Sequence, residues 1–376
     1  QRRKAVEPFE RLWALACVAA REQGITLAAD GLRGVRDATK AYSSFAHNKK
    51  KATPDFTMLK YQSRTGAVST YWTTLIGGEL AHADSGKLEY EGFELARQFP
   101  MPRLTEKDRK RLADPEVAHR VSIQLDDLTE WAEVCHLVAA GDTEREQLGD
   151  ALTADDRRDC MNRAFFEMAG ADGLPDTWDV QSLERLRSEL NSTDRAVALG
   201  LPTVVDAVLV TERFHEAVLT VFQYLLWWGT QQAGKTVDDM VAERDVQQAT
   251  NRCRETALLL RQYREKCEHT EVREAIKGFA GFAYAIDRAT SPRLVVDEIL
   301  HHHHQVQSGK VDGGSPKRDW IGFDGGKLLR PSPRFQRMEP PTAAIGNSLT
   351  HPYRLEPFIY MLRENNLLPR PIQEVD

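Results

Sequence analysis

The run of four histidines at residues 301–304 is the most conspicuous group in this sequence with metal-binding chemistry. If the run is helical, Asp297, His301 and His304 share one face, at positions i, i+4 and i+7. Imidazole nitrogens and a carboxylate are ligands that divalent metals such as Zn²⁺ accept. A complete site needs a further group, such as His351 or an acidic side chain from elsewhere. The alternative is a polar helix end, where protonated imidazoles favour the helix dipole.

Arg264 and His269 have the spacing R-x4-H. This pair resembles the motif of HEPN-type ribonucleases, which implies polarisation of an RNA phosphate and acid or base catalysis. Glu265 stands where that family usually carries Asn, Asp or His, so the alternative is two solvated residues at a helix end. The patterns G-x-S-x-G, H-E-x-x-H and G-x-G-x-x-G are absent. The sequence therefore leans against an enzyme, and no cofactor is expected.

Residues 53–76 have the pattern of two short helices separated by a break. Thr53 is a candidate N-cap, so a first helix is predicted from Asp55. A second helix over residues 67–76 repeats apolar residues, Trp72 among them, at helical spacing. Its outward face would carry small hydroxyl-bearing side chains, namely Ser69, Thr70 and Thr73.

A hairpin and a closing helix are predicted directly after this pair. Residues 79–82 and 88–90 flank the turn at 84–87, which has Gly86 at the strained position. The apolar residues of 92–99 recur at helical spacing, so a third helix would close a small core.

Residues 88–96, Leu-Glu-Tyr-Glu-Gly-Phe-Glu-Leu-Ala, resemble the L-T-x-x-G-x-x-L-A segment that follows the wing in many winged helix-turn-helix proteins. Glu89 stands where those proteins usually carry Thr. The resemblance covers roughly residues 30–100 and implies a nucleic-acid-binding helix at 67–76, with the hairpin as its wing. The residues expected to contact DNA are Arg64, Ser69, Thr70 and Thr73 in the groove, Lys60 and Lys87 on phosphates, and Lys49, Lys50 and Lys51 beside them.

Charge is distributed unevenly along the chain. Residues 1–51 contain 11 Lys or Arg against 5 Asp or Glu, whereas residues 111–300 contain 21 against 35. Phosphate contacts supply most non-specific affinity for DNA, so the basic end suits a nucleic acid and the acidic middle suits a protein partner. The alternative is that an electrically neutral winged helix joins proteins.

The C-terminal region is rich in loops and again basic. Residues 308–337 contain 7 Lys or Arg against 3 Asp, interleaved with aromatic side chains. Lys317 and Arg318 are therefore further candidates for nucleic-acid contacts. The alternative is a surface loop that its aromatic residues hold against the protein.

Composition is that of a globular chain, with 376 residues of which 41% are hydrophobic. Five cysteines without a CxxC pair favour a reducing compartment, and no signal peptide is recognised, so a cytoplasmic location is expected. The most apolar stretch, residues 204–228, contains five charged or titratable residues, which predicts a buried helix and no membrane span.

Helical patterns occupy most of the chain. Helices are predicted at 8–21, 125–140, 155–169, 203–232, 236–268, 270–289, 292–307 and 352–367, with a hairpin around Asp324, Gly325 and Gly326. The predicted fold is mainly α. A winged helix-turn-helix domain with a small β-hairpin (1–100) precedes an acidic helical bundle (101–300) and a basic loop-rich segment with a C-terminal helix (301–376).

These features together predict a non-catalytic subunit that binds DNA within a larger bacterial complex and meets a protein partner through its acidic helices. This arrangement, a winged module joined to a large helical body, is loosely similar to accessory subunits of multi-component bacterial systems, including antiviral defence. Two alternatives stay open: a winged-helix scaffold between proteins, and a metal-dependent or HEPN-like nuclease.

Overall fold

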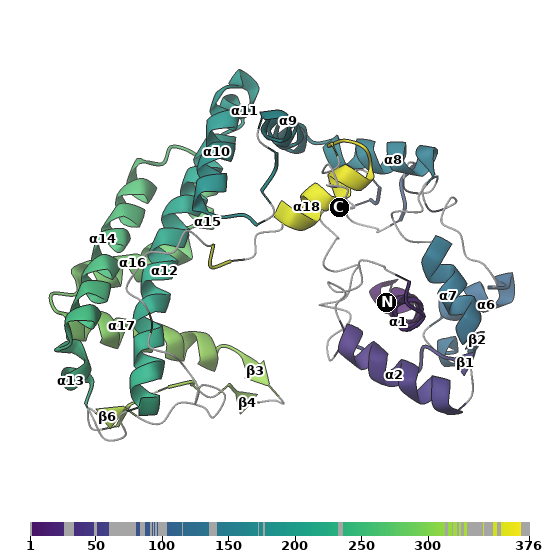
Figure 1. Ribbon diagram of the computed structural model, residues 1–376, viewed down its shortest axis with the longest axis horizontal. Coiled ribbons are helices and arrows are strands. Elements are labelled where there is room, and N and C mark those ends of the chain that lie inside the picture. Colours follow the sequence, from purple (N-terminus) through teal and green to yellow (C-terminus); the bar gives the residue numbers. More distant parts are fainter. Residues whose placement is uncertain are drawn as a thin grey trace, which may run out of the picture. The chain divides into compact units, whose positions relative to one another are not determined.

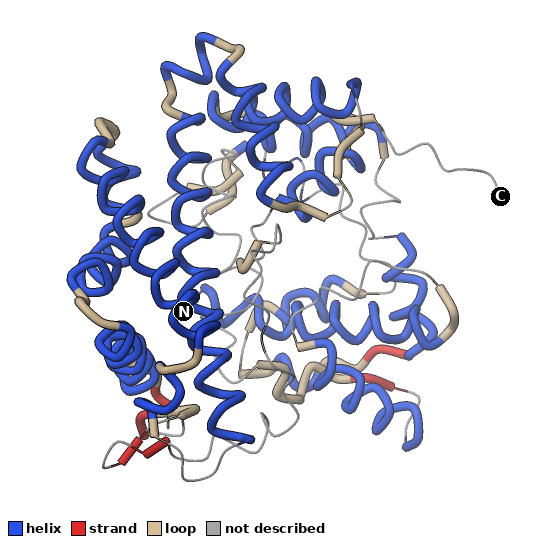
Figure 2. The backbone as a smooth tube through the Cα atoms, turned by 60° about the vertical axis from the view of Figure 1, so that its left-hand side comes forward, coloured by secondary structure: helices blue, strands red, loops and turns tan. Residues whose placement is uncertain are grey.

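The computed structural model describes most of the chain outside a few segments (Figure 1). The described residues are 2–25, 34–48, 51–59, 80–82, 87–90, 92, 94, 96, 104–114, 116–134, 141–171, 173–175, 177–231, 236–312, 315–317, 319–321, 323–324, 327–328, 341, 349–351 and 355–369. Helices predominate among them, which confirms the predicted mainly α class (Figure 2).

The chain forms two compact units. The N-terminal unit comprises residues 1–166 and 358–376, and the central unit comprises residues 167–357. The division differs from the three predicted domains. Residues 104–134 belong with the N-terminal helices because helix α7 (Leu125–Val134) packs against helix α1 (Arg2–Glu22).

The N-terminal unit is built mainly from short helices. Its elements are α1 (Arg2–Glu22), α2 (Val35–Asn48), β1 (Lys51–Ala52), α6 (Glu106–Leu112), the 3-10 helix η1 (Ala118–Arg120), β2 (Ile123–Gln124), α7 (Leu125–Val134) and α8 (Asp142–Thr153). Helix α9 (Asp156–Ala171) continues from this unit into the central one, and α18 (Leu355–Glu364) returns to it.

Helix α1 forms the centre of the N-terminal core because it is apolar on two sides. Leu12, Leu15, Ala16, Ala19 and Ala20 recur at helical spacing and pack with residues of α7 and β2. In α7, the buried ring of Trp131 meets the rings of Phe9 and Trp13 edge to face, at 5.2 and 5.7 Å between centroids. The other side of α1 packs against α2, as the contact of Ala14 and Val18 with Ala38 shows.

The helix predicted to begin at Asp55 is wrong for residues 55–59. Strand β1 pairs antiparallel with β2, and the following residues run through bends without helical structure. The carbonyl of Pro54 accepts hydrogen bonds from the amide of Phe56 (3.0 Å) and the guanidinium of Arg11 (3.2 Å). Met58 is buried against α1 and α2. Strand pairing, the hydrogen bonds to Pro54 and the burial of Met58 thus stabilise a non-helical conformation here. They outweigh the local helix signal of the sequence.

The central unit consists of helices followed by two small hairpins. Its helices are α10 (Val180–Asn191), α11 (Asp194–Ala198), α12 (Leu201–Gln231), α13 (Val237–Val241), α14 (Arg244–Lys266), α15 (Thr270–Ala275), α16 (Lys277–Arg288) and α17 (Pro292–Ser308). Its strands are β3 (Val311–Asp312), β4 (Ser315–Pro316), β5 (Phe323–Asp324) and β6 (Lys327–Leu328).

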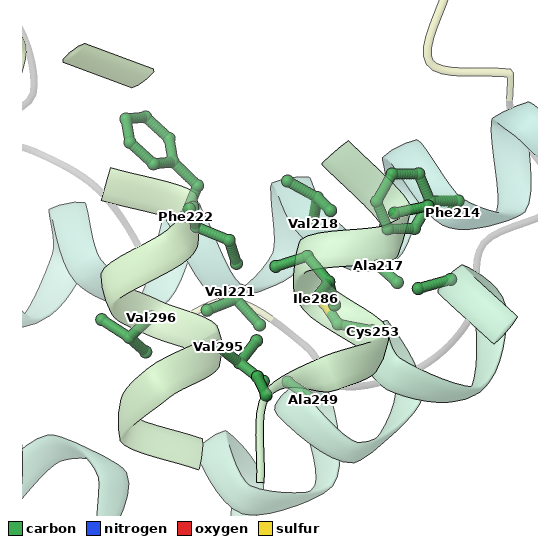
Figure 3. Close-up of a cluster of buried hydrophobic side chains, with 14 of the residues drawn as sticks. Phe214, Ala217, Val218, Val221, Phe222, Ala249, Cys253, Ile286, Val295 and Val296 are labelled. Carbon is green, nitrogen blue, oxygen red and sulfur yellow. The ribbon is translucent and has the colours of Figure 1, made fainter. Parts of the chain in front are cut away.

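Helices α12, α14, α16 and α17 enclose the core of the central unit. Figure 3 shows side chains from all four turned toward one another, including Val221 of α12, Cys253 of α14, Ile286 of α16 and Val295 of α17. Each of these four side chains is fully buried. Burial also raises the pKa of the Cys253 thiol to about 12, so this cysteine serves packing, as its apolar setting suggests.

The predicted continuous helix at 236–268 is divided into α13 and α14. Val237 and Met240 of α13 are fully buried, and so is Val246 of α14. Val237 and Val246 are nine positions apart, which is about two and a half helical turns, so one straight helix would place these two side chains on opposite faces. The break at residues 242–243 lets both face the core. The predicted helix at 270–289 is likewise divided, at Ile276.

Two antiparallel hairpins follow α17. The predicted hairpin around Asp324 is confirmed, since Phe323 pairs with Leu328 and Asp324 with Lys327. The hairpin of β3 and β4 was not predicted from the sequence. Among the helices that the structure describes, none is both long and apolar enough to cross a membrane.

Candidate functional site

The two flanks of the predicted wing lie side by side in the N-terminal unit. An isolated antiparallel bridge joins Ala81 and Leu88. The amide of His82 donates to the carbonyl of Lys87 (2.8 Å), and the amide of Glu89 donates to the carbonyl of Leu80 (3.1 Å). Residues 83–86, which include the predicted turn residues Asp84, Ser85 and Gly86, lie outside the described part of the chain.

A helical segment follows this pairing directly. Gly92, Glu94 and Ala96 are helical, as predicted for the closing helix, and Tyr90, predicted in the hairpin flank, is helical as well. A Cβ atom at Gly92 would lie only 1.9 Å from the carbonyl oxygen of Leu80. Position 92 therefore requires glycine, because the helix backbone passes directly against the first flank of the hairpin.

The two flanks of the hairpin differ in exposure. Leu80 and Ala81 are buried, whereas Leu88 is 49% exposed and Tyr90 is 75% exposed. Lys87 is exposed at the start of the second flank. One flank thus faces the protein, whereas the other flank and the start of the following helix present a cationic and two large apolar side chains to solvent.

The predicted nucleic-acid contacts fall largely on residues that the structure leaves undescribed. Lys51 is exposed in β1, and Lys317 is exposed just after β4 in the central unit. The predicted contacts Lys49, Lys50, Lys60, Arg64, Ser69, Thr70, Thr73 and Arg318 lie outside the described residues, as does the whole helix predicted at 67–76.

The four histidines on α17 have four different environments. His301 hydrogen-bonds with Gln305 (2.8 Å), and His302 stacks on Phe282 with ring centroids 4.0 Å apart. Nε2 of His303 accepts the backbone N–H of Trp320 (3.0 Å), and His304 lies 2.8 Å from the carboxylate of Asp319. The run therefore attaches the 319–320 segment to α17.

The predicted metal group of Asp297, His301 and His304 is not assembled as a common site. The carboxylate of Asp297 accepts two hydrogen bonds from Arg293, at 3.0 and 3.1 Å. His304 is paired with Asp319, as described above. Positions on one helical face thus have separate partners, because neighbouring segments reach them at different points.

Arg264 and His269 also have separate surroundings. Nε of Arg264 donates to the carbonyl of Arg273 (3.4 Å). The exposed ring of His269 lies over Gly200, where a Cβ atom would be 2.5 Å from its Cε1. These contacts connect the start of α15 with the ends of neighbouring helices.

A different group of titratable side chains meets inside the central unit. Glu212 and His215 of α12 and His351 of the segment 349–351 each offer one ligand atom, and these atoms lie within 4.8 Å of one another. Nδ1 of His351 is 2.5 Å from Oε1 of Glu212. The rings of His215 and His351 are stacked, with centroids 4.3 Å apart.

Thr350 lies in the middle of this group. Its backbone N–H and its hydroxyl both donate to Oε2 of Glu212, at 2.5 and 2.7 Å. Nδ1 of His215 is 2.8 Å from the same hydroxyl oxygen. The three ligand-bearing residues and Thr350 are hereafter the Glu212 cluster.

Burial controls the electrostatics of the Glu212 cluster. Glu212 is only 2% exposed. A buried carboxylate is costly unless hydrogen-bonded, and Thr350 and His351 supply those bonds. Burial, and to a lesser degree the neighbouring His351, lower the pKa of His215, although the charge of Glu212 opposes that shift.

Sequence reasoning missed this cluster for a definable reason. Glu212 and His215 form an E-x-x-H pair, which places both on one face of a helix. By itself that spacing indicates only polar residues on one side of a buried helix. The third member, His351, is 139 residues from Glu212.

Comparisons with known proteins add no relative: no family model, no curated protein and no solved structure matches this chain.

Proposed function

We propose that this chain binds DNA through a winged helix-turn-helix in its N-terminal unit and acts as a non-catalytic subunit of a larger assembly. The observation that carries the proposal is the bridge between Ala81 and Leu88, followed at once by a helix whose Gly92 abuts Leu80. This is the hairpin and helix order that the resemblance to winged-helix proteins implies for residues 79–99.

Charge supports a nucleic acid as the partner of this unit. Lys51 and Lys87 are exposed, and the first 51 residues carry an excess of basic residues. Lys and Arg side chains that neutralise phosphates release bound counterions, which provides sequence-independent affinity. The acidic residues 111–300 would repel DNA, so we assign them to contacts with a protein partner.

Fluorescence anisotropy with labelled duplex DNA, single-stranded DNA and RNA tests the proposal. We expect duplex binding that weakens steeply between 50 and 200 mM salt, by roughly 10³-fold if about six phosphates are contacted. Arg64→Ala combined with Lys87→Ala should weaken binding. The slope of log K against log salt concentration should become shallower by about one for each phosphate contact that is lost.

A matched control removes the same charge elsewhere in the N-terminal unit. Lys107→Ala combined with Lys110→Ala deletes two exposed cations of α6 and should leave DNA affinity within about threefold. Equal losses in the two double variants, or no salt-dependent binding by the unaltered chain, would exclude DNA recognition by the predicted module.

A protein scaffold is the second candidate, because Leu88 and Tyr90 are large apolar side chains exposed on the hairpin and the helix that follows it. Exposed apolar side chains grouped together are typical of protein interfaces. Leu88→Ser combined with Tyr90→Ser separates the two functions. A DNA-binding wing should retain salt-dependent affinity in this variant, whereas a scaffold would lose its partner protein.

A further inference from the structure

The Glu212 cluster contains the donor set of a transition-metal site. Two imidazoles and one carboxylate provide two nitrogen ligands and one oxygen ligand. Zinc sites with two His and one Glu ligand are well established in proteins, whereas Mg²⁺ and Ca²⁺ prefer oxygen ligands alone. The chemistry of the three side chains therefore favours Zn²⁺ or a similar divalent transition metal.

The geometry of the cluster is close to that of such a site. The ligand atoms lie within 4.8 Å of one another. In a tetrahedral zinc site with bonds of about 2.0–2.1 Å, neighbouring ligand atoms are roughly 3.3 Å apart. The remaining difference needs only small side-chain rotations, because Glu212 and His215 already share one face of α12 and His351 stacks on His215.

Surrounding groups restrict the orientation of the ligands. Thr350 holds the Glu212 carboxylate through both its backbone N–H and its hydroxyl. The ring of Phe279 meets those of His215 and His351 edge to face, each at 6.3 Å between centroids. Ligands oriented by outer hydrogen bonds and packing bind metals more tightly than free ones, commonly by about 10–100-fold.

The cluster also has an open side. Glu212 is almost completely buried, whereas the side chain of His351 is 39% exposed. A metal held from the buried side would therefore face solvent near His351. Three protein ligands and one position for water are typical of zinc sites that can do chemistry.

We infer that Glu212, His215 and His351 bind one divalent transition-metal ion, with Zn²⁺ as the preferred ion. This site is separate from the predicted one on α17 and uses residues of α12 and the 349–351 segment. It does not depend on DNA binding by the N-terminal unit. The competing explanation is that the cluster is only a hydrogen-bonded attachment of that segment to α12.

Zinc titration of the metal-free full chain, in competition with a chromophoric chelator, tests the inference. We expect one Zn²⁺ per chain, and at least about 100-fold weaker binding when His215→Ala and His351→Ala are combined. The matched control combines His301→Ala with His304→Ala. It removes two histidines from a surface run that could itself attract zinc, and it should leave the tight site unchanged.

Two further measurements separate metal binding from folding. Circular dichroism of each metal-free variant checks that its helices persist, and His351→Gln, at the half-exposed position, replaces the double variant if they do not. With Co²⁺ as the probe, the unaltered chain should show the intense visible bands of a four- or five-coordinate site, and His351→Gln should lack them.

The inference fails if the unaltered chain binds Zn²⁺ no more tightly than the folded variant that lacks His215 and His351. It also fails if the tight site disappears in the control that lacks His301 and His304. Either result would leave the Glu212 cluster as a hydrogen-bonded attachment.

Discussion

The central unit contains two groups of histidines. One group is contiguous in the sequence but has separate surroundings, and the other is distant in the sequence but meets in space. The run at 301–304 is contiguous, yet its members contact four different partners. His215 and His351 are far apart in the sequence, yet their rings stack and share a buried carboxylate environment. Proximity along one helix therefore does not make a site, because a site also needs a neighbouring segment that brings further ligands to the same point.

Removal of the Glu212 carboxylate should have the largest effect. Glu212→Ala leaves the backbone N–H of Thr350 without its acceptor and removes the carboxylate that lies beside Nδ1 of His351. We expect a loss of about 2–4 kcal/mol in the free energy of unfolding, since unmatched buried polar groups are costly. Urea unfolding followed by circular dichroism measures it. Glu212→Gln should lose less, because its amide oxygen still accepts from Thr350, and equal losses would contradict the role assigned to these bonds.

His303 should have an intermediate effect, because it is the member of the run that both packs and accepts a backbone hydrogen bond. His303→Ala removes the acceptor for Trp320 N–H and a ring contact with Phe222. The expected loss is about 1–2 kcal/mol. His303→Gln retains an acceptor atom and should recover part of it. A His303→Ala protein as stable as the parent would show that the 319–321 segment is held by other contacts.

The pH dependence of stability tests the buried environment of His303. Burial lowers the pKa of His303, so the folded chain resists its protonation more than the unfolded chain does. Below the ordinary imidazole pKa of about 6.5, the unfolded state binds more protons, and stability falls as the pH drops toward the lowered folded pKa. Unfolding free energies at pH 7.5 and 5.5 should differ more for the parent than for His303→Gln. A larger difference in the variant would contradict the assigned shift.

The exposed members of the run should have the smallest effect. His301→Ala combined with His304→Ala removes a contact with Gln305 and a pair with Asp319, all at exposed side chains. Surface pairs of this kind contribute little, so the free energy of unfolding should change by no more than about 0.5 kcal/mol. Thermal unfolding of the double variant checks this. A loss as large as that of His303→Ala would mean that the whole run, and not one histidine, holds the 319–321 segment.

Local sequence signals predicted several elements well. Ser291 caps α17 and Pro292 begins it, in agreement with the helix predicted at 292–307. The hairpin of β5 and β6 has the pairing expected around Asp324. Such signals succeed because caps and turns depend on residues within about four positions of one another.

Predictions that depended on distant partners were less successful. The helix signal at Asp55 was outweighed by pairing of β1 with β2 and by the contact between Pro54 and Arg11. The predicted pairing of the segments around residues 81 and 88 is present as one bridge, whereas the helix predicted at 67–76 lies outside the described residues and stays a prediction.

By itself, the sequence determined the helical character of the chain, the positions of some caps and turns, and the residue types available for chemistry. Only the tertiary structure decided which of those residues meet. Glu212 and His351 are 139 residues apart, and their contact exists because the 349–351 segment packs against α12. Periodicity along one helix carries no information about that packing, whose free energy comes from surfaces formed only after the chain has folded.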